Sequence, residues 1–159
     1  MAKFKYRMQN ILDIKQKLEE AAKMEFAEAN ARVLEEEEKL SALHGRRRAY
    51  EAEGKQLRKQ QMHVPDIKNN IQALDILRGM IKAQILEVEK AQRIQEEKRL
   101  ALQEAMQERK TQEKLYENAF AEFMQEENAR EGREVDELTS YKYGKKSREE
   151  NNQYEVNHG

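Results

Sequence analysis

Apolar residues recur at alternating steps of three and four over the first third of the chain. A repeat of about 3.5 residues is the signature of a left-handed coiled coil. Two successive steps of four, from Leu18 to Ala22 and from Ala22 to Phe26, predict one stutter, where the supercoil unwinds locally. We therefore expect a helix over about residues 4–61, with a seam of Phe4, Met8, Ile11, Lys15, Leu18, Ala22, Phe26, Ala29, Val33, Glu36, Leu40, Leu43, Arg47, Tyr50, Gly54 and Leu57.

A second seam follows, and its alternation of four and three never breaks. It predicts a helix over about residues 66–131. The expected seam positions are Ile67, Ile71, Leu74, Arg78, Ile81, Ile85, Val88, Gln92, Gln95, Arg99, Leu102, Met106, Arg109, Glu113, Tyr116, Phe120 and Phe123.

The stretch MHVPDIKNN separates the two seams and contains the only proline. Pro65 lacks a backbone donor and disfavours helical geometry at Val64. Asp66 suits the first turn of a new helix. A turn at residues 62–66 is too short for anything but antiparallel neighbours. The predicted fold is therefore all-α: two long helices that form an antiparallel coiled-coil hairpin.

Folding the chain at the turn places residue i opposite about residue 128 minus i. In this register Phe4 faces Phe120 and Phe123, and Ile11 faces Tyr116. Glu36 would face Gln92, within a polar middle section. The opening of the chain and its late aromatic residues are then two halves of one closed end.

No sustained seam continues beyond residue 131. The remaining segment is polar and contains two glycines. This composition predicts a disordered tail over residues 132–159, appended to a coiled coil over residues 1–131.

Composition supports this interpretation and narrows the function. Of 159 residues, 38% are charged and 38% hydrophobic, and helix formers dominate. The 30 basic residues nearly balance the 31 acidic ones, which gives no reason to expect nucleic acid as a partner. There is no cysteine and no apolar run of membrane-spanning length. We expect a soluble cytoplasmic protein.

A search for catalytic chemistry finds little. The three histidines lack metal-ligand spacing, and a two-helix hairpin offers no active-site pocket. Gly144-Lys145-Lys146-Ser147 resembles the end of a phosphate loop, but Thr139 stands where such a loop needs glycine. We expect no enzymatic activity, no cofactor and no metal.

Two surface features remain open. Arg46, Arg47 and Arg48, extended by Lys55, Arg58 and Lys59, form a basic cluster near the turn. They are either a solvated face or a surface for an acidic partner, a lipid or a nucleic acid. Ile76, Leu77 and Met80 form either an exposed apolar strip for a partner or peripheral packing, since Leu74, Ile81 and Ile85 already fill the expected seam.

The opening FKYRMQNILDIKQKLEEAAKMEFAEA, the central IQALDILRGMIKAQI and the aromatic end of the second helix resemble the flagellar FliJ family. This family is the small coiled-coil component of the flagellar type III export apparatus, and the resemblance extends to about residue 130. It implies a central stalk that enters the hexameric ring of the export ATPase and promotes its assembly. It also implies contacts with the cytoplasmic part of the export gate and with export chaperones, at the inner face of the membrane, with at most peripheral membrane association.

The same resemblance implies two sites. The ring-facing end would consist of Phe4, Tyr6, Ile11, Tyr116, Phe120 and Phe123. The gate-facing strip would consist of Ala73, Leu77, Met80 and Gln84. Alternatives are the equivalent stalk of a virulence-type secretion system, a general coiled-coil scaffold or holdase chaperone, and a homodimer of two hairpins.

Overall fold

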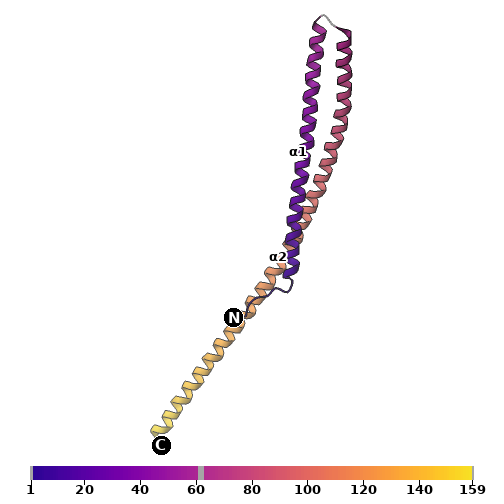
Figure 1. The fold of residues 1–159 in the computed structure, drawn as a ribbon. Coiled ribbons are helices and arrows are strands. Elements are labelled where there is room, and N and C mark those ends of the chain that lie inside the picture. The colour runs from indigo at the N-terminus through magenta and orange to yellow at the C-terminus, as the bar shows by residue number, and fades with distance from the viewer. Residues whose placement is uncertain (1, 61–62, 159) are drawn as a thin grey trace. The chain divides into compact units, whose positions relative to one another are not determined.

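The computed structural model describes residues 2–60 and 63–158, and within these residues it consists of two helices and no strand (Figure 1). Helix α1 spans Gln9–Lys59 and helix α2 spans Val64–His158. From the turn onward they run side by side in opposite directions (Figure 1). The predicted all-α antiparallel hairpin is confirmed.

Contacts divide the chain into two compact units. The first consists of Ile14–Arg109 and contains the hairpin on both sides of the turn. The second brings the N-terminal segment up to Asp13 against the chain from Lys110 onward.

Helix α1 begins later than expected. The residues before the turn at Arg7 and Met8 are not helical, and the Gln9 N–H donates to the Tyr6 carbonyl at 3.2 Å. Phe4 and Tyr6 both contact Tyr116. Two residues that are two apart share a face in an extended chain but not in a helix. The extended start lets both rings reach the same part of α2.

Helix α2 begins earlier than expected, so residues 64–66 of the predicted turn belong to this helix. The His63 carbonyl accepts from the backbone N–H groups of Asp66 at 3.0 Å and Ile67 at 3.4 Å. Pro65 therefore lies in the first turn, where its missing N–H costs no helical hydrogen bond. Residues 61 and 62, where the prediction placed the end of α1 and the start of the turn, lie outside the described residues.

The segment from residue 132 is helical as far as His158, not disordered as the sequence predicts. Every described side chain from residue 131 to 157 is exposed. No seam holds this part of α2 against another element. Its Glu, Lys, Arg and Gln residues have high helix propensity, and propensity together with continuity from the packed helix accounts for its form.

The seam of α1 has no stutter. Leu12 and Glu19 are buried, whereas Ile11 is 39% and Leu18 50% exposed. The prediction placed Ile11 in the seam instead of Leu12, and the apolar Leu18 instead of Glu19. Steps of three and four then continue unbroken through the buried and half-buried positions Leu12, Lys15, Glu19, Ala22, Phe26, Ala29, Val33, Glu36, Leu40, Leu43, Arg47, Tyr50, Gly54 and Leu57.

The seam of α2 differs from the prediction at one of its two positions in each seven-residue repeat between residues 70 and 99 and again at Phe120, whereas the predicted positions Met106 and Glu113 are half-buried. Leu77, Gln84 and Ala91 are buried or half-buried, and their C-terminal neighbours Arg78, Ile85 and Gln92 are exposed. The other predicted position is confirmed throughout. It comprises Leu74, Ile81, Val88, Gln95, Leu102, Arg109, Tyr116 and Phe123.

A close approach of the two helices lies near the turn. Gly54 is buried, and a Cβ atom added to it would lie 2.6 Å from Asn70 Oδ1. The absence of that atom lets the Asn70 side chain enter the seam and donate to the Tyr50 carbonyl at 2.8 Å. One heptad further along α2 lies Leu77, which is only 2% exposed.

Candidate functional site

An aromatic cluster joins the N-terminal segment to α2. The Phe4 ring centroid lies 5.2 Å from those of Phe120 and Phe123 and 5.5 Å from that of Tyr116. Tyr6 packs edge-to-face on Tyr116 at 5.2 Å. Such contacts each contribute about 0.5–1.5 kcal/mol beyond burial of area. The predicted facing of Phe4 with Phe120 and Phe123 is confirmed.

Ile11 is the exception among the predicted ring-facing residues. Its neighbour Leu12 is 6% exposed and occupies the seam, while Ile11 remains 39% exposed. Tyr116, expected opposite Ile11, contacts Phe4 and Tyr6 instead. The difference arises because the chain starts in an extended form, whereas the register assumed a helix from residue 4.

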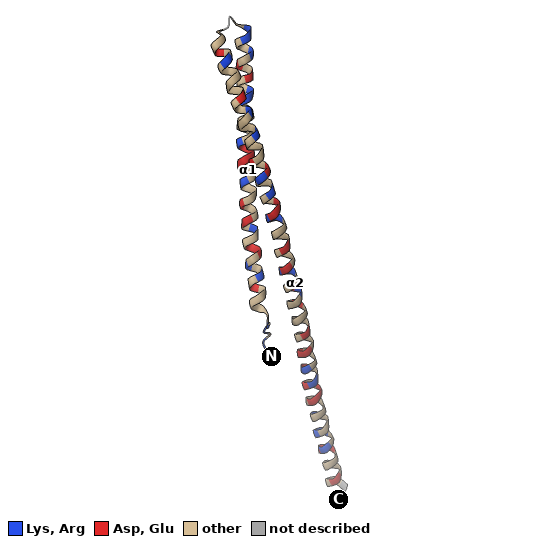
Figure 2. Ribbon diagram, turned by 90° about the vertical axis from the view of Figure 1, so that its right-hand side faces the viewer, with Lys and Arg blue, Asp and Glu red and all other residues tan. Residues whose placement is uncertain are grey.

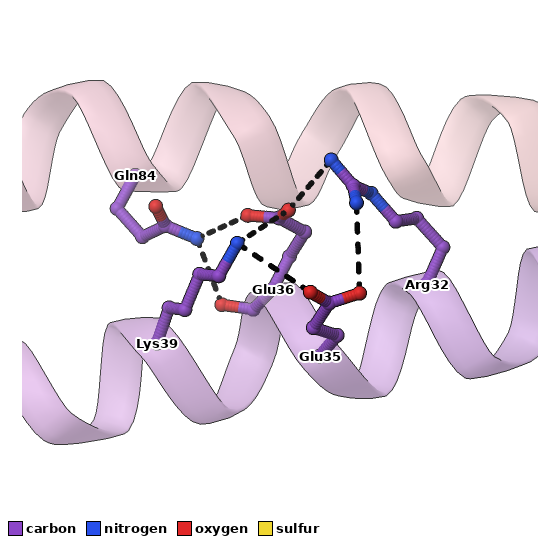
Figure 3. Close-up of polar contacts among 5 residues, drawn as sticks. All are labelled: Arg32, Glu35, Glu36, Lys39 and Gln84. Atoms are coloured by element: carbon purple, nitrogen blue, oxygen red, sulfur yellow. Dashed lines mark hydrogen bonds and ion pairs between the residues drawn. The ribbon is translucent and has the colours of Figure 1, made fainter.

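A buried carboxylate lies at the middle of the Ile14–Arg109 unit (Figure 3). Glu36 is 3% exposed, and Gln84 Nε2 donates to its Oε2 at 2.6 Å and to its backbone carbonyl at 2.9 Å. Arg32 and Lys39 reach the other oxygen, Oε1, at 3.1 and 3.4 Å. The expected pairing of Glu36 with Gln92 is therefore wrong by about two helical turns.

Polar neighbours outweigh burial in setting the charge of Glu36. The hydrogen bond from Gln84 lowers the pKa of this carboxyl below its usual value of 4.5, and Lys39 and Arg32 lower it further. Burial opposes them by raising the pKa. Glu36 is thus ionised at neutral pH inside the seam.

A second buried carboxylate is paired across the hairpin. Glu19 is 5% exposed and accepts hydrogen bonds from Nε and Nη2 of Arg109, the latter at 3.3 Å. Arg109 is the main cause of the lowered pKa of Glu19, and Lys23 adds to it. In the same seam Gln95 Nε2 donates to Asn30 Oδ1 at 2.6 Å.

These polar pairs were missed as pairs, although their members stand in the sequence at seam spacing. A buried polar layer favours one alignment of two helices, because any shift leaves a polar group buried without a partner. The sequence did contain a sign of these pairs, because steps of three and four continue without a break if Glu19 is taken as the seam position. The preference for an apolar residue selected Leu18 instead, and the buried Glu19 was missed.

The four residues of the predicted gate-facing strip do not share one surface. Leu77 is the most deeply buried side chain described, and Gln84 is bound to Glu36. Of the two alternatives left open for Ile76, Leu77 and Met80, the exposed apolar strip is therefore wrong for Leu77, which is packed in the seam. Met80 is 41% exposed and Ile76 59%, so these two carry the apolar surface of this part of α2. Ala73 is half-buried.

A groove of about 490 Å³ lies beside the seam near the turn. It forms where Gly54 and Asn70 replace larger apolar residues. Both helices contribute to its lining, which consists of Tyr50, Glu53, Leu57, Asp66, Asn69, Asn70 and Ala73.

Neither a metal site nor a membrane span is found in the part of the chain that the structure describes. No three histidine or acidic side chains there are grouped to bind a metal ion. Neither helix has a stretch long and apolar enough to cross a bilayer.

Comparison with known families gives one match. The family model described as "Flagellar FliJ protein" matches residues 4–148, which include all of α1, the aromatic cluster and α2 as far as residue 148. No curated protein and no solved structure matches the chain.

Proposed function

The chain belongs to the flagellar FliJ family and is thus a component of flagellar protein export, and we propose that it acts there as the central stalk of the export ATPase ring. In this role it promotes assembly of the hexamer and links it to the export gate and to export chaperones. In this proposal the ring hydrolyses ATP and the chain does not. The complex lies at the cytoplasmic face of the inner membrane.

The aromatic cluster is the observation that carries this proposal. It fixes the N-terminal segment on α2 and leaves apolar surface around it. Phe120 is 42% exposed, Leu115 43% and Met124 40%. Exposed apolar surface beside a packed aromatic cluster is a candidate for contact with another protein. We place the ring contact here, at Phe4, Tyr6, Tyr116, Phe120 and Phe123, with Ile11 at its edge.

The gate contact is proposed for the groove side of α2 near the turn. Ala73 lines the groove, and Met80 provides exposed apolar surface. Leu77 and Gln84 support this surface from within, because both are held in the seam. Substitutions of these two residues would act through the hairpin, not through lost contact with the gate.

Titration of the chain into the export ATPase of the same organism tests the ring contact. We expect a saturating rise in hydrolysis rate and in hexamer population. Met124→Glu should raise the concentration needed for half of the maximal rise about tenfold, since it places a charge in apolar contact surface. Leu34→Glu is the matched control, because Leu34 is 60% exposed on α1.

An unchanged rate and hexamer population at saturating concentration would reject the stalk function. It would favour a scaffold or chaperone function within export. If Met124→Glu and Leu34→Glu weaken the stimulation equally, the ring contact does not lie at the aromatic cluster.

A further inference from the structure

Charge is distributed unevenly along the hairpin. Residues 42–82, which flank the turn, contain nine Lys and Arg and four Asp and Glu. The rest of the chain has 21 basic and 27 acidic residues by difference from the totals of 30 and 31. The region that flanks the turn therefore has a net positive charge and the rest of the chain a net negative charge, although the whole chain is nearly neutral. Figure 2 shows basic residues on both helices near the turn.

The basic residues near the turn differ from those farther along the hairpin in their partners. Lys15, Arg32 and Lys98 each lie within 3.5 Å of a carboxylate oxygen. Among the described residues near the turn, seven exposed cations have no carboxylate within the 4.0 Å of an ion pair. They are Arg46, Arg48, Lys55, Arg58, Lys59, Lys68 and Lys82.

Five of these cations, all except Arg46 and Lys59, share one side of the hairpin. The groove marks the other side, since Glu53 of α1 and Ala73 of α2 both line it. At 100° per residue, Arg48 and Lys55 lie 140–200° around α1 from Glu53. The same rotation places Lys68 and Lys82 away from Ala73 on α2. We call the surface formed by Arg48, Lys55, Arg58, Lys68, Arg78 and Lys82 the basic side.

Two isoleucines interrupt the charge on the basic side. Ile71 is 47% exposed and Ile85 39%, and they stand two heptads apart beside the seam. At 1.5 Å per residue their Cα atoms are about 21 Å apart along α2. Two acidic residues among these cations are already paired: Asp75 binds Arg78 at 3.3 Å, and Glu51 lies 3.7 Å from Arg47.

We propose that the basic side binds an acidic amphipathic helix of a partner protein. Such a helix would lay apolar residues on Ile71 and Ile85 and carboxylates on the flanking cations. Two half-exposed isoleucines are too little apolar surface for insertion into a membrane interface. Their alignment with the seam instead suits a third helix packed along the hairpin. This site is separate from both contacts of the proposed function.

A synthetic helix provides the test. The probe is a labelled peptide of three heptads with leucine at two positions of each and glutamate at the flanking positions. Its control has glutamine in place of glutamate. We expect the full chain to bind the glutamate peptide at least about tenfold more tightly at low salt, and expect added salt to remove the difference.

Matched charge reversals locate the site. Arg48→Glu, Lys55→Glu and Lys68→Glu together should weaken binding of the glutamate peptide about tenfold or more. Lys17→Glu, Lys90→Glu and Arg93→Glu together make the same change in net charge at exposed residues farther from the turn. They should weaken it less than about threefold. Ile71→Ser should weaken binding of the glutamate and glutamine peptides alike.

Circular dichroism of each variant checks that the helices persist, as expected for exposed residues. Equal weakening by the two triple variants would overturn the proposal, because it would show attraction to net charge alone. Binding to phosphatidylglycerol vesicles without binding to the peptide would overturn it in favour of a lipid surface. The first triple variant should still stimulate the ATPase, so failure here is distinguishable from failure of the stalk function.

Discussion

The middle of the hairpin and its turn end use charge in opposite ways. In the middle, Glu19 and Glu36 lie in the seam itself and are bound by Arg109, Gln84 and nearby cations. Near the turn, the deepest seam residue is Leu77, and most of the exposed cations, with the exception of Arg78, have no ion-pair partner among the described residues. Charge in the middle therefore acts within the fold, and charge near the turn is available to another molecule.

This difference separates two requirements of a long antiparallel pair. Apolar seams alone tolerate a shift by one heptad, because each repeat resembles the next. Buried polar pairs remove that freedom, since a shift leaves a carboxylate without its partner. The seam near the turn contains one such polar contact, from Asn70 to the Tyr50 carbonyl, for which Gly54 leaves room. The short turn supplies much of the remaining constraint.

The largest effect should come from a charge in the apolar part of the seam. Leu77→Asp is expected to reduce the free energy of unfolding by about 4 kcal/mol or more, because it removes a buried side chain and buries an unpaired carboxylate. Met80→Asp, three residues away and 41% exposed, should cost less than about 1 kcal/mol. Urea denaturation followed by circular dichroism measures both. Similar losses for the two variants would contradict the seam described here.

The sequence was sufficient for the fold and for half of the seam. The alternation of three and four specifies two helices, and Pro65 with the short loop specifies their antiparallel arrangement. The choice between adjacent seam positions was not decided, because Leu18 and Glu19, or Leu77 and Arg78, differ by only one step. A rule that prefers apolar residues selects Leu18, yet the pairing of Glu19 with Arg109 favours the other position.

The candidate sites were predictable to different degrees. The facing of Phe4 with Phe120 and Phe123 followed from the register set by the turn, whereas the contact of Tyr6 with Tyr116 did not, since the register placed Ile11 opposite Tyr116. The extended start was not predictable from helical spacing. The state of the C-terminal segment was missed as well, because absence of a seam says nothing about helix propensity.

Removal of one partner of the buried ion pair should have the next largest effect. Glu19→Leu or Arg109→Leu alone leaves a charged group in or beside the seam without its partner, so each should lower Tm by several degrees. The double variant should recover most of the loss, because leucines at both positions restore an apolar layer. Thermal unfolding of the three variants measures the interaction free energy between Glu19 and Arg109. Additive losses would indicate that the two residues do not interact.

A smaller effect should appear in the pH dependence of stability. The folded-state pKa of Glu36 is below 4.5, mainly because of Gln84. Its contribution to stability is therefore complete above the unfolded value and is lost as pH falls through the lower folded value. Glu36→Gln should flatten the decline in stability as pH falls below about 4.5. Glu37→Gln, at the exposed neighbour, is the control and should leave the decline nearly unchanged.

The smallest effect should come from the free cations, and it bears most directly on the contrast between the two regions. Lys55→Ala with Arg58→Ala should change the free energy of unfolding by less than about 0.5 kcal/mol, because these side chains have no partner in the fold. Lys98→Ala removes an ion pair to Glu25 at 3.1 Å and should cost up to about 1 kcal/mol. A larger loss in the first variant than in the second would mean that the turn-end cations stabilise the hairpin. They would then no longer be available to a partner, and the basic side would be part of the fold.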